Sequence, residues 1–461
     1  MNSKILKKQL YIAEPVKKDI IEIVNKFNEK GFECYLVGGS VRDLVLGHDV
    51  LDYDFATNAL PEDVVSIFRR VVPTGIKHGT VSVLMKEKQY EITTYRADGK
   101  YLDGRRPEAV HFSKTLEEDV KRRDFTINGL AYDIKEEKII DYAGGLADID
   151  SRIIRTIGNP VDRFSEDGLR PFRACRFAAK LYFSIDADTL SAIPKTLDTA
   201  KAVSAERIRD ELLKLMDAER PSIGLEYMRE SGLMKLVLPE LLEGFNVKQN
   251  KYHIYDIYYH SLYSCDAIPD ADRIIKFAAL LHDIGKFVTR KEDEDGEGTF
   301  YNHEVVGAKI TRRIMKRLKF SNEETGKVAN LIVNHMFHYV DVWTDGAVRR
   351  FMRKVGLENL NDLLMLRLAD RIGNGQRSGL PAPIMELQRR IARVIEEDSA
   401  LTVKDLDIDG NVIMSEFNVE PGPIIGKILN ELLEIVLDDP EANKKETLLS
   451  KAREIYKSLN G

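Results

Sequence analysis

Hydrophobic and polar positions recur with two different periods along the chain. Residues 80–85 and 89–95 alternate apolar and polar side chains at a period of two, which is typical of half-buried β-strands. The short apolar run 32–37 predicts a buried strand, and the pattern after Gly38-Gly39 predicts a helix that ends near Leu46. The first ~150 residues are therefore expected to mix strands and helices.

From about residue 160 onward the period changes to that of a helix. Ile208, Leu212 and Leu215, for example, recur at i, i+4 and i+7. The pattern predicts a small α/β head followed by a long α-helical body. Glycine and polar residues predict loops at 96–107, 290–299 and 373–382.

Composition is that of an ordinary soluble globular protein. The chain has 461 residues, of which 43% are hydrophobic and 31% charged, and at roughly 100–200 residues per domain it should form two to four domains. Its 69 basic and 75 acidic residues give a net charge of −6, which excludes a globally basic nucleic-acid binder but not local basic faces. We find no membrane-length apolar run, no secretory signal and no CxxC pair among Cys34, Cys175 and Cys265, so we expect a cytoplasmic protein.

Gly38, Gly39 and Arg42 form a candidate phosphate cradle where a predicted strand turns into a helix. Two glycines let the backbone approach a ligand, the helix N-terminus offers free N–H groups, and Arg42 can add a charge-assisted fork. On its own, Gly-Gly before a helix is equally consistent with a tight turn.

Asp52 and Asp54 follow about a dozen residues later. On a strand they would share one face, ~6–7 Å apart, where two carboxylates repel each other unless a cation lies between them. Such hard oxygen ligands suit Mg²⁺, and two ions would activate an attacking hydroxyl and stabilise a leaving pyrophosphate. Without the preceding cradle, two aspartates at this spacing would be interpreted as solvated loop residues. Its position after the cradle favours a catalytic metal site.

Six motifs occur in this order: GGSVRDLVLG, DYDFAT, TGIKHGTVSV, EITTYRADGKYLDGRRP, RRDFTINGLAYD and EDGLRPFRACRFAAKL. Together they resemble the bacterial class II tRNA nucleotidyltransferases, which comprise the CCA-adding enzymes and their poly(A) polymerase relatives. The resemblance implies that Asp52 and Asp54 hold the catalytic metals and that Asp124 faces the ribose of the nucleotide. It gives Arg123 a phosphate or orienting role, with an ordinary ion pair as the alternative. Glu91 is either a third metal-binding carboxylate or a structural glutamate.

Asp167 and Arg170 carry the hydrogen-bonding chemistry needed to read a nucleobase. We expect them at i and i+3 on one helix face. A carboxylate accepts hydrogen bonds and so matches the amino group of cytosine or adenine, while a guanidinium donates them and so matches the neighbouring ring nitrogen. Guanine and uracil present the reversed pattern of donors and acceptors and would be rejected. The alternative is a surface ion pair. The neighbouring Arg173 and Arg176 favour nucleotide binding, and selecting CTP and ATP is the role that the family gives this motif.

The loop 96–107 resembles a flexible loop that the family needs when its pocket switches from C to A. That resemblance favours full CCA addition or A addition. An ordinary exposed turn is the alternative.

A second group of residues follows the order H…HD…D: His260, His282, Asp283 and Asp370. It resembles the HD phosphohydrolase superfamily, and its imidazole and carboxylate donors suit a divalent transition metal such as Mn, Ni, Co or Zn. Asp283 would bind metal or orient the attacking water. Lys286 would neutralise phosphate or simply be solvated.

His303 and His335 fall where binuclear members of that superfamily have further ligands, which predicts a second metal. His253 and His338 are assigned to structure or surface. Many relatives in the tRNA enzyme family have lost the HD set, so its retention favours hydrolysis of phosphomonoesters or cyclic phosphodiesters at RNA or nucleotide ends.

A basic stripe follows His303. Its residues recur on one helix face: Lys309, Arg312, Arg313, Lys316 and Arg317. Such a stripe either tracks a phosphate backbone or forms a solvated surface.

The resemblance thus implies a CCA-adding tRNA nucleotidyltransferase that uses CTP, ATP and Mg²⁺, with an additional HD phosphohydrolase activity. An A-adding enzyme or a poly(A) polymerase with the same head is the alternative. The expected partners are tRNA, ATP and CTP, with neither membrane nor DNA. The implied fold is α+β, with a polymerase-β-like mixed-sheet head followed by mostly helical parts. The expected domains are a head (1–157), a neck (158–235), an HD body (236–385) and a tRNA-binding tail (386–461).

Overall fold

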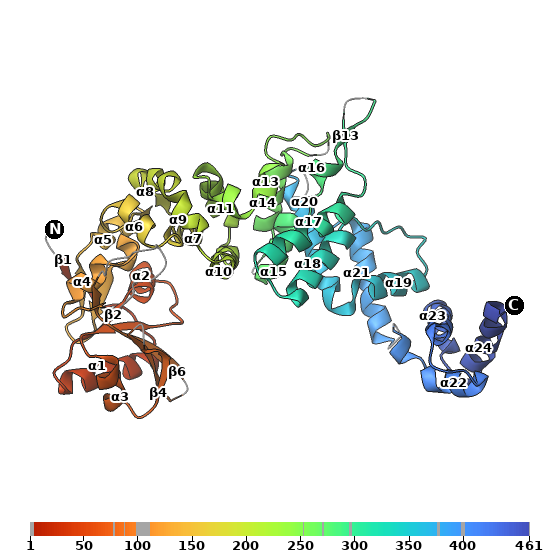
Figure 1. Ribbon diagram of the computed structural model, residues 1–461, viewed down its shortest axis with the longest axis horizontal. Coiled ribbons are helices and arrows are strands. Elements are labelled where there is room, and N and C mark those ends of the chain that lie inside the picture. The colour runs from red at the N-terminus through yellow and green to blue at the C-terminus, as the bar shows by residue number, and fades with distance from the viewer. Residues whose placement is uncertain are drawn as a thin grey trace. The chain divides into compact units, whose positions relative to one another are not determined.

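The computed structural model describes residues 4–76, 79–86, 88–97, 111–251, 253–269, 272–294, 297–375, 379–397 and 402–460. The chain divides into two compact units, residues 1–242 and 243–461 (Figure 1). The first unit contains a large sheet and the second is almost entirely helical. The α+β fold predicted from the sequence is therefore confirmed, while the finer division into four domains stays a prediction.

An eight-stranded sheet forms the head, in the order β1-β10-β9-β2-β3-β6-β5-β4. Its β3 and β6 run parallel and the other neighbours antiparallel, so the sheet is mixed as expected. The strands are β1 (Lys4–Lys7), β2 (Cys34–Val37), β3 (Asp54–Thr57), β4 (Val71–Gly75), β5 (Thr80–Met85), β6 (Lys88–Thr94), β9 (Leu130–Asp133) and β10 (Lys138–Asp141). Two short strands pair separately, β7 (Arg96–Ala97) and β8 (His111–Phe112).

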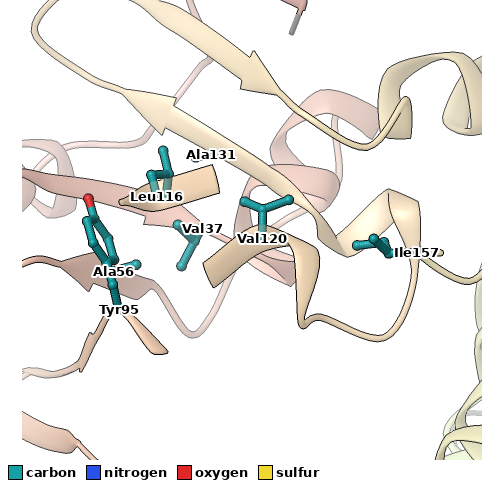
Figure 2. Close-up of a cluster of buried hydrophobic side chains, with 7 residues drawn as sticks. All are labelled: Val37, Ala56, Tyr95, Leu116, Val120, Ala131 and Ile157. Atoms are coloured by element: carbon teal, nitrogen blue, oxygen red, sulfur yellow. The ribbon is translucent and has the colours of Figure 1, made fainter. Parts of the chain in front are cut away.

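Four helices complete the head: α1 (Val16–Glu29), α2 (Gly39–Leu46), α3 (Pro61–Ile67) and α4 (Leu116–Lys121). In α1 the buried Ile20, Ile23, Val24 and Phe27 follow the i, i+3, i+4, i+7 spacing of one apolar face. Helix α4 is held by a buried cluster that joins it to β2, β3 and β9 (Figure 2). The cluster consists of Val37, Ala56, Tyr95, Leu116, Val120, Ala131 and Ile157. It fixes the segment that follows α4 next to the end of β2.

Short helices follow the head within the same unit. They are α5 (Gly145–Asp150), α6 (Pro160–Glu166), α7 (Arg170–Leu181), α8 (Ala187–Ala192), α9 (Leu197–Lys201), α10 (Ala205–Met216), α11 (Pro221–Glu230), α12 (Leu233–Val237) and α13 (Pro239–Leu242). A parallel pair, β11 (Ile153–Ile154) and β12 (Ser184–Ile185), accompanies them. Helix α7 packs against α10 and α11, and Ile208, Leu212 and Leu215 are buried on α10 as the periodicity predicts.

The second unit begins with three helices, α14 (Ile257–Asp266), α15 (Arg273–Leu281) and α16 (Lys286–Thr289), and a hairpin of β13 (Lys291–Glu292) and β14 (Gly298–Thr299). It continues with α17 (His303–Arg317), α18 (Asn322–Asn334), α19 (Asp345–Val355), α20 (Leu360–Gly373), α21 (Ala382–Glu396), α22 (Gly410–Phe417), α23 (Pro423–Asp438) and α24 (Lys445–Asn460). Every residue from Ile274 to Leu281 is buried, so α15 is a central helix enclosed on all sides.

Three sequence predictions about loops have different outcomes. The loop predicted at 290–299 contains the short β13–β14 hairpin instead of being wholly irregular. Most of the loop 96–107 lies outside the described residues, as do parts of 290–299 and 373–382.

Among the helices that the structure describes, none has the length and apolar character needed to cross a membrane.

Candidate active sites

The glycine cradle forms where β2 ends and α2 begins, as the sequence predicts. Gly38 has φ +74°, a conformation that side chains rarely adopt, and a Cβ there would lie 2.9 Å from Nη1 of Arg123. Arg42 does not reach into this space. It is 3% exposed, donates to the carboxylate of Asp43 at 2.8 and 2.9 Å, and donates to Oδ1 of Asn128 at 2.6 Å. The sequence predicts that the Arg42 guanidinium donates directly to a phosphate. In the structure this guanidinium is instead part of the wall of the cradle, where it donates to Asp43 and Asn128.

Three carboxylates gather at the start of β3. Asp54 is the first residue of β3 and pairs in register with Glu91 on the parallel β6. Asp52 precedes the strand instead of lying in it, which corrects the predicted strand over both aspartates, because β3 begins two residues later than expected. The buried Tyr53 separates the two aspartates in sequence, and the Asp52 carboxylate is still close enough to raise the pKa of Asp54.

Negative charge predominates in this cluster. Burial raises the pKa of Asp54 to about 6, the Glu91 and Asp52 carboxylates contribute in the same direction, and Arg123 opposes them. Oxygen donors with excess negative charge are what Mg²⁺ requires, so these residues fit the predicted metal.

We expect Asp54→Asn to stabilise the metal-free protein above pH 6. The pKa of Asp54 is raised from 3.8 to about 6, so the folded state disfavours the ionised carboxylate and stability is lost as pH rises through that window. An amide cannot ionise, so Tm in EDTA should rise by a few degrees at pH 7.5, at about 2–4 °C per kcal/mol. Calorimetry should show no gain at pH 4 or for the exposed control Asp49→Asn; an equal gain at both pH values would contradict this origin.

Arg123 and Asp124 follow α4. Arg123 donates to the fully buried Asp119 at 2.9 Å, so it forms an ion pair and also lies beside Gly38. Asp124 accepts from Arg173 at 2.8 Å and from Asn128 at 3.0 Å. Burial would raise the pKa of Asp124, but the charge of Arg173 and these hydrogen bonds outweigh it and hold the pKa at about 2. Asp124 therefore stays ionised and joins the head to α7.

Asp167 and Arg170 do not share a helix face. Helix α6 ends at Glu166, Asp167 is extended with φ −141° and ψ 106°, and α7 begins at Arg170. Arg170 is 9% exposed and donates to Glu166 Oε2 at 2.6 Å and to backbone carbonyls. The guanidinium beside Asp167 belongs to Arg207 on α10, at 3.1 Å. Arg207 was not among the predicted site residues, because its only signal in the sequence is its place on a predicted helix.

The charges of Arg173 and Arg176, which were expected to favour nucleotide binding, are largely neutralised in the structure. Arg176, 8% exposed, donates to Glu211 Oε2 at 2.6 Å, and Arg173 lies between Asp124 and Glu211. Since Glu211 follows Arg207 by one turn of α10, this helix carries partners for both Asp167 and the arginines of α7.

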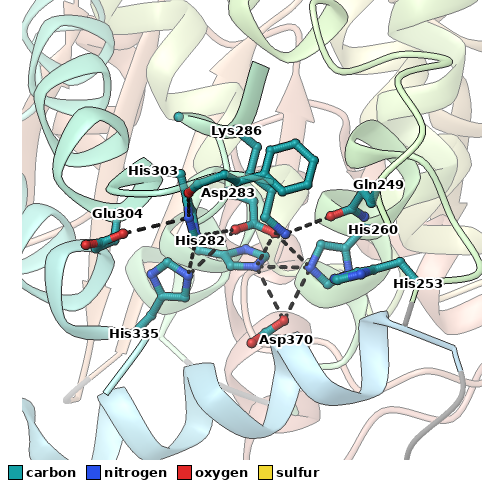
Figure 3. A network of polar contacts seen from close by, with 12 residues as sticks. Gln249, His253, His260, His282, Asp283, Lys286, His303, Glu304, His335 and Asp370 are labelled. Atoms are coloured by element: carbon teal, nitrogen blue, oxygen red, sulfur yellow. Dashed lines mark hydrogen bonds and ion pairs between the residues drawn. The ribbon is translucent and has the colours of Figure 1, made fainter. Parts of the chain in front are cut away.

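The second unit brings all four residues of the H…HD…D pattern together (Figure 3). His260 lies on α14, His282 and Asp283 follow the buried α15, and Asp370 lies on α20. The Nε2 atom of His260 is 3.2 Å from that of His282, 3.1 Å from Asp283 Oδ2 and 3.3 Å from Asp370 Oδ1. Four donor atoms therefore converge on one point.

A second group shares Asp283. His303 at the start of α17 places Nε2 3.2 Å from Asp283 Oδ1, and His335 after α18 places its Nε2 3.6 Å from the same oxygen (Figure 3). The two Nε2 atoms are 3.4 Å apart. Each oxygen of Asp283 thus faces one pair of histidines. The ligand atoms of His260, His282 and Asp283 lie within 4.8 Å of one another, as do those of Asp283, His303 and His335.

The protonation of three rings supports metal binding. Each Nδ1 lies at hydrogen-bond distance from a backbone carbonyl, which can only accept, so Nδ1 carries the proton and Nε2 presents its lone pair to the centre. The pairs are His282 with Ala279 at 2.8 Å, His303 with Phe300 at 2.7 Å and His335 with Ile332 at 2.7 Å. Lone pairs that face each other at these distances need a cation between them. Without a metal a proton takes that place, since burial would lower the pKa of His282 but Asp283 and Asp370 raise it to about 10. The donor set fits a divalent transition metal.

Lys286 is buried, which contradicts the solvated interpretation of this residue, while its role toward phosphate stays a prediction. It is 6% exposed and its Nζ lies 2.6 Å from Asp283 Oδ2 and 2.7 Å from Gln249 Oε1. Burial would raise the pKa of Asp283, but His282 and Lys286 hold it well below its ordinary value. Lys286 therefore keeps Asp283 ionised; it is not solvated.

A cavity of about 840 Å³ opens onto this centre. Its lining includes Asp283, His303, His335 and Asp370 together with His253, His338, Arg367, Arg371 and Asn374. His253 was assigned to structure or surface, but its ring lies 5.3 Å from that of His260 and its Nδ1 contacts Asn250 Oδ1 at 2.9 Å.

Helix α17 presents the predicted stripe to solvent. Ile310 and Ile314 are buried, while the basic side chains are exposed: Lys309, Arg312, Arg313, Lys316 and Arg317. The same helix begins at His303, so the stripe starts beside the metal-ligand cluster.

Comparisons with known proteins cover nearly the whole chain. A family model described as the poly A polymerase head domain matches residues 34–155, and a tRNA nucleotidyltransferase domain 2 model matches 301–452. The "Probable RNA and SrmB- binding site of polymerase A" model matches 182–244.

Individual relatives agree with the family models. The chain is 33% identical to a CCA-adding enzyme of Streptococcus gordonii over 95% of its own length and 97% of that protein. It is 32% identical to a CCA-adding enzyme of Ligilactobacillus salivarius over 95% and 96% of the two chains. Among solved structures, the Bacillus stearothermophilus CCA-adding enzyme in complex with CTP matches with a TM-score of 0.74 and 28% identity, over 97% of this chain and 99% of that one.

Proposed function

Because the chain belongs to the family of class II CCA tRNA nucleotidyltransferases and poly(A) polymerases, we propose that it transfers CMP and AMP from CTP and ATP to the 3′ end of tRNA. The observation that carries the proposal is the carboxylate cluster of Asp52, Asp54 and Glu91 on the same sheet as the Gly38 cradle. Similarity to CCA-adding enzymes along nearly the whole chain supports the choice of tRNA and of both nucleotides.

The site residues of the head divide the tasks of this reaction between them. The Gly38 backbone leaves room for the triphosphate, and Arg123, held by Asp119, adds positive charge beside it. Mg²⁺ held by Asp52 and Asp54 would lower the pKa of the primer hydroxyl and neutralise pyrophosphate. The primer 3′-oxygen forms a bond to the α-phosphorus as the bond to pyrophosphate breaks, and the hydroxyl proton passes to solvent.

Base choice is proposed to depend on Asp167, which would accept the amino group shared by cytosine and adenine. In the structure Arg207 is the guanidinium next to it, and Arg170 would have to release Glu166 to reach a base. Arg173 and Arg176 would act on the nucleotide through Asp124 and Glu211.

We expect Asp167→Ala to relax base choice by about 10–100-fold, the loss of one hydrogen bond to a charged group. Misincorporation of GMP and UMP, measured by product sequencing, should rise relative to CMP and AMP, while the Mg²⁺ concentration for half-maximal rate stays the same. The exposed Asp162→Ala on α6 is the matched control. Unchanged selectivity would refute the role of Asp167.

The direct test uses tRNA transcripts that end before the CCA, after C or after CC. Incubation with each nucleotide and sequencing of the products should give a complete CCA on all three. Addition of A alone to the CC transcript would identify an A-adding enzyme, and a long A tail would identify a poly(A) polymerase.

We further propose that the second unit is a metal-dependent phosphohydrolase that acts on phosphomonoesters or cyclic phosphodiesters at nucleotide or RNA ends. The convergence of His260, His282, Asp283 and Asp370 on one point supports it, and His303 and His335 add a place for a second metal. The exposed stripe of α17 would contact RNA by its positive charge. The helices of 386–461 would bind the tRNA body.

A further inference from the structure

Two arginines of α19 form a row of ion pairs with α23. Arg350 donates from Nε to Glu434 Oε2 at 2.7 Å and from Nη2 to Asp438 Oδ2 at 2.5 Å. Arg353 donates from Nη1 to Glu434 Oε1 at 2.9 Å and from Nη2 to Asn430 Oδ1 at 3.0 Å. The acceptors follow one another at i, i+4 and i+8 along one face of α23. This face of α23 therefore covers the guanidinium groups of α19.

The ion pairs of this row lie at the protein surface. The side chains of Arg350 and Arg353 are 39% and 33% exposed, and those of Glu434 and Asp438 are 48% and 58% exposed. Such pairs contribute little to stability, because water and salt screen the attraction between the charges. A competing anion can therefore displace the two carboxylates at a small cost in free energy.

A buried contact beside the row joins the same two helices. The Arg349 side chain is 5% exposed, and its Nη1 donates to the carbonyl oxygen of Leu437 at 3.1 Å. Gly346 permits the close approach of the backbones, since a Cβ there would lie only 3.1 Å from Leu437 O and from Asp438 Cα. Exchange of the exposed carboxylates therefore does not require α23 to leave α19.

The guanidinium groups of the row have the chemistry of a phosphate site. Carboxylate and phosphate both present oxygens to the planar fork of N–H donors, so one anion can replace the other. Lys354 follows Arg353 directly and is exposed, which extends the row to three positive charges at i, i+3 and i+4. An RNA backbone offers phosphates in series and releases counterions when it binds, an advantage that a single small anion lacks.

We propose that Arg350 and Arg353 form a binding site for RNA phosphates that Glu434 and Asp438 cover while no RNA is bound. The two carboxylates act as an internal substitute for phosphate, and tRNA displaces them when it binds. The inference rests on the tRNA binding proposed above. It differs from a purely structural joint in one respect, because the two halves of each ion pair then act on RNA affinity in opposite directions.

The test measures the dissociation constant (Kd) of the full chain for a tRNA that ends before the CCA, over a range of KCl concentrations. Glu434→Gln uncovers the arginines and should lower Kd about two- to fivefold, which the release of one exposed ion pair allows. Arg350→Gln and Arg353→Gln should each raise Kd and reduce the salt dependence, the slope of log Kd against log[KCl], by about one.

Glu386→Gln is the matched control, because it removes the same charge from an exposed ion pair with Arg389 on α21. It should change Kd less than Glu434→Gln does. If an arginine variant fails to fold, as judged by thermal unfolding, Arg353→Lys takes its place. That variant keeps the charge and loses the fork, so Kd should rise while the salt dependence stays the same.

A shift of Kd in the same direction for Glu434→Gln and the arginine variants would identify a structural joint and overturn the proposal. Unchanged Kd in these variants, or a control as strong as Glu434→Gln, would overturn it as well. Incorporation of CMP by the same preparations separates this inference from the proposed function. Opposite shifts of Kd without incorporation contradict the transfer reaction alone, whereas a wild type that binds no tRNA contradicts both.

Discussion

Asp52→Ala and Asp54→Ala should each abolish incorporation of labelled CMP and AMP into tRNA. The carboxylates of β3 and β6 face one another with little positive charge, so each is needed to hold the cation that neutralises pyrophosphate. Losing several kcal/mol of that stabilisation corresponds to a rate loss on the order of a thousandfold or more. Single-turnover transfer at saturating Mg²⁺ measures the effect.

The matched control is Asp49→Ala, an exposed aspartate a few residues earlier in the same segment. It should transfer both nucleotides at the wild-type rate. Thermal unfolding should show that neither active-site variant disrupts the head, since Asp52 is exposed and Asp54 only half-buried. Wild-type incorporation by either Asp52→Ala or Asp54→Ala would contradict the assignment of the metal site to these two aspartates.

Phosphate release by the second unit should disappear in Asp283→Asn and His282→Ala, while nucleotidyl transfer continues unchanged. Asp283 faces both pairs of histidines, so its loss weakens every metal position at once, and outer partners cannot replace it. The expected loss is at least a hundredfold, and EDTA should reproduce it in the wild type. The two reactions can be measured on one preparation, because the residues of each lie within a single compact unit.

The exposed His48→Ala serves as the control for histidine removal. A parallel loss of nucleotidyl transfer in Asp283→Asn would show that the change disturbs the fold more widely. Phosphate release that survives both substitutions would contradict the assignment of the cluster. A metal count by atomic absorption distinguishes one bound ion from two, and His335→Ala should lower it only if the second position is filled.

Local patterns in the sequence predicted the elements and the order of the site residues well. Alternating apolar positions identified β5 and β6, and the run before Gly38 identified β2. The H…HD…D pattern anticipated a cluster that joins α14, α15 and α20, although its members are separated by up to 110 residues. Such residue types have little reason to occur together except at a metal.

Partners chosen by packing could not be predicted in this way. Arg170 was expected beside Asp167 on one continuous helix. In the structure the helix is interrupted between α6 and α7, and Arg170 contacts Glu166. The space it leaves is taken by Arg207, which comes from a helix 40 residues later. Lys286 is buried for a similar reason, since its position after α15 faces the cluster and not the solvent.

The separation of the two sets of metal-binding residues also has a consequence for inheritance. Among the residues that the structure describes, the ligands of each set come from one unit, so substitutions at one set accumulate without selection on the other. A lineage that no longer needs the hydrolase would retain the fold of the second unit through its buried apolar residues, such as those of α15, while its histidines drift. Comparing substitution rates at His282 and at Asp54 across descendants would therefore reveal which of the two chemistries each organism still uses.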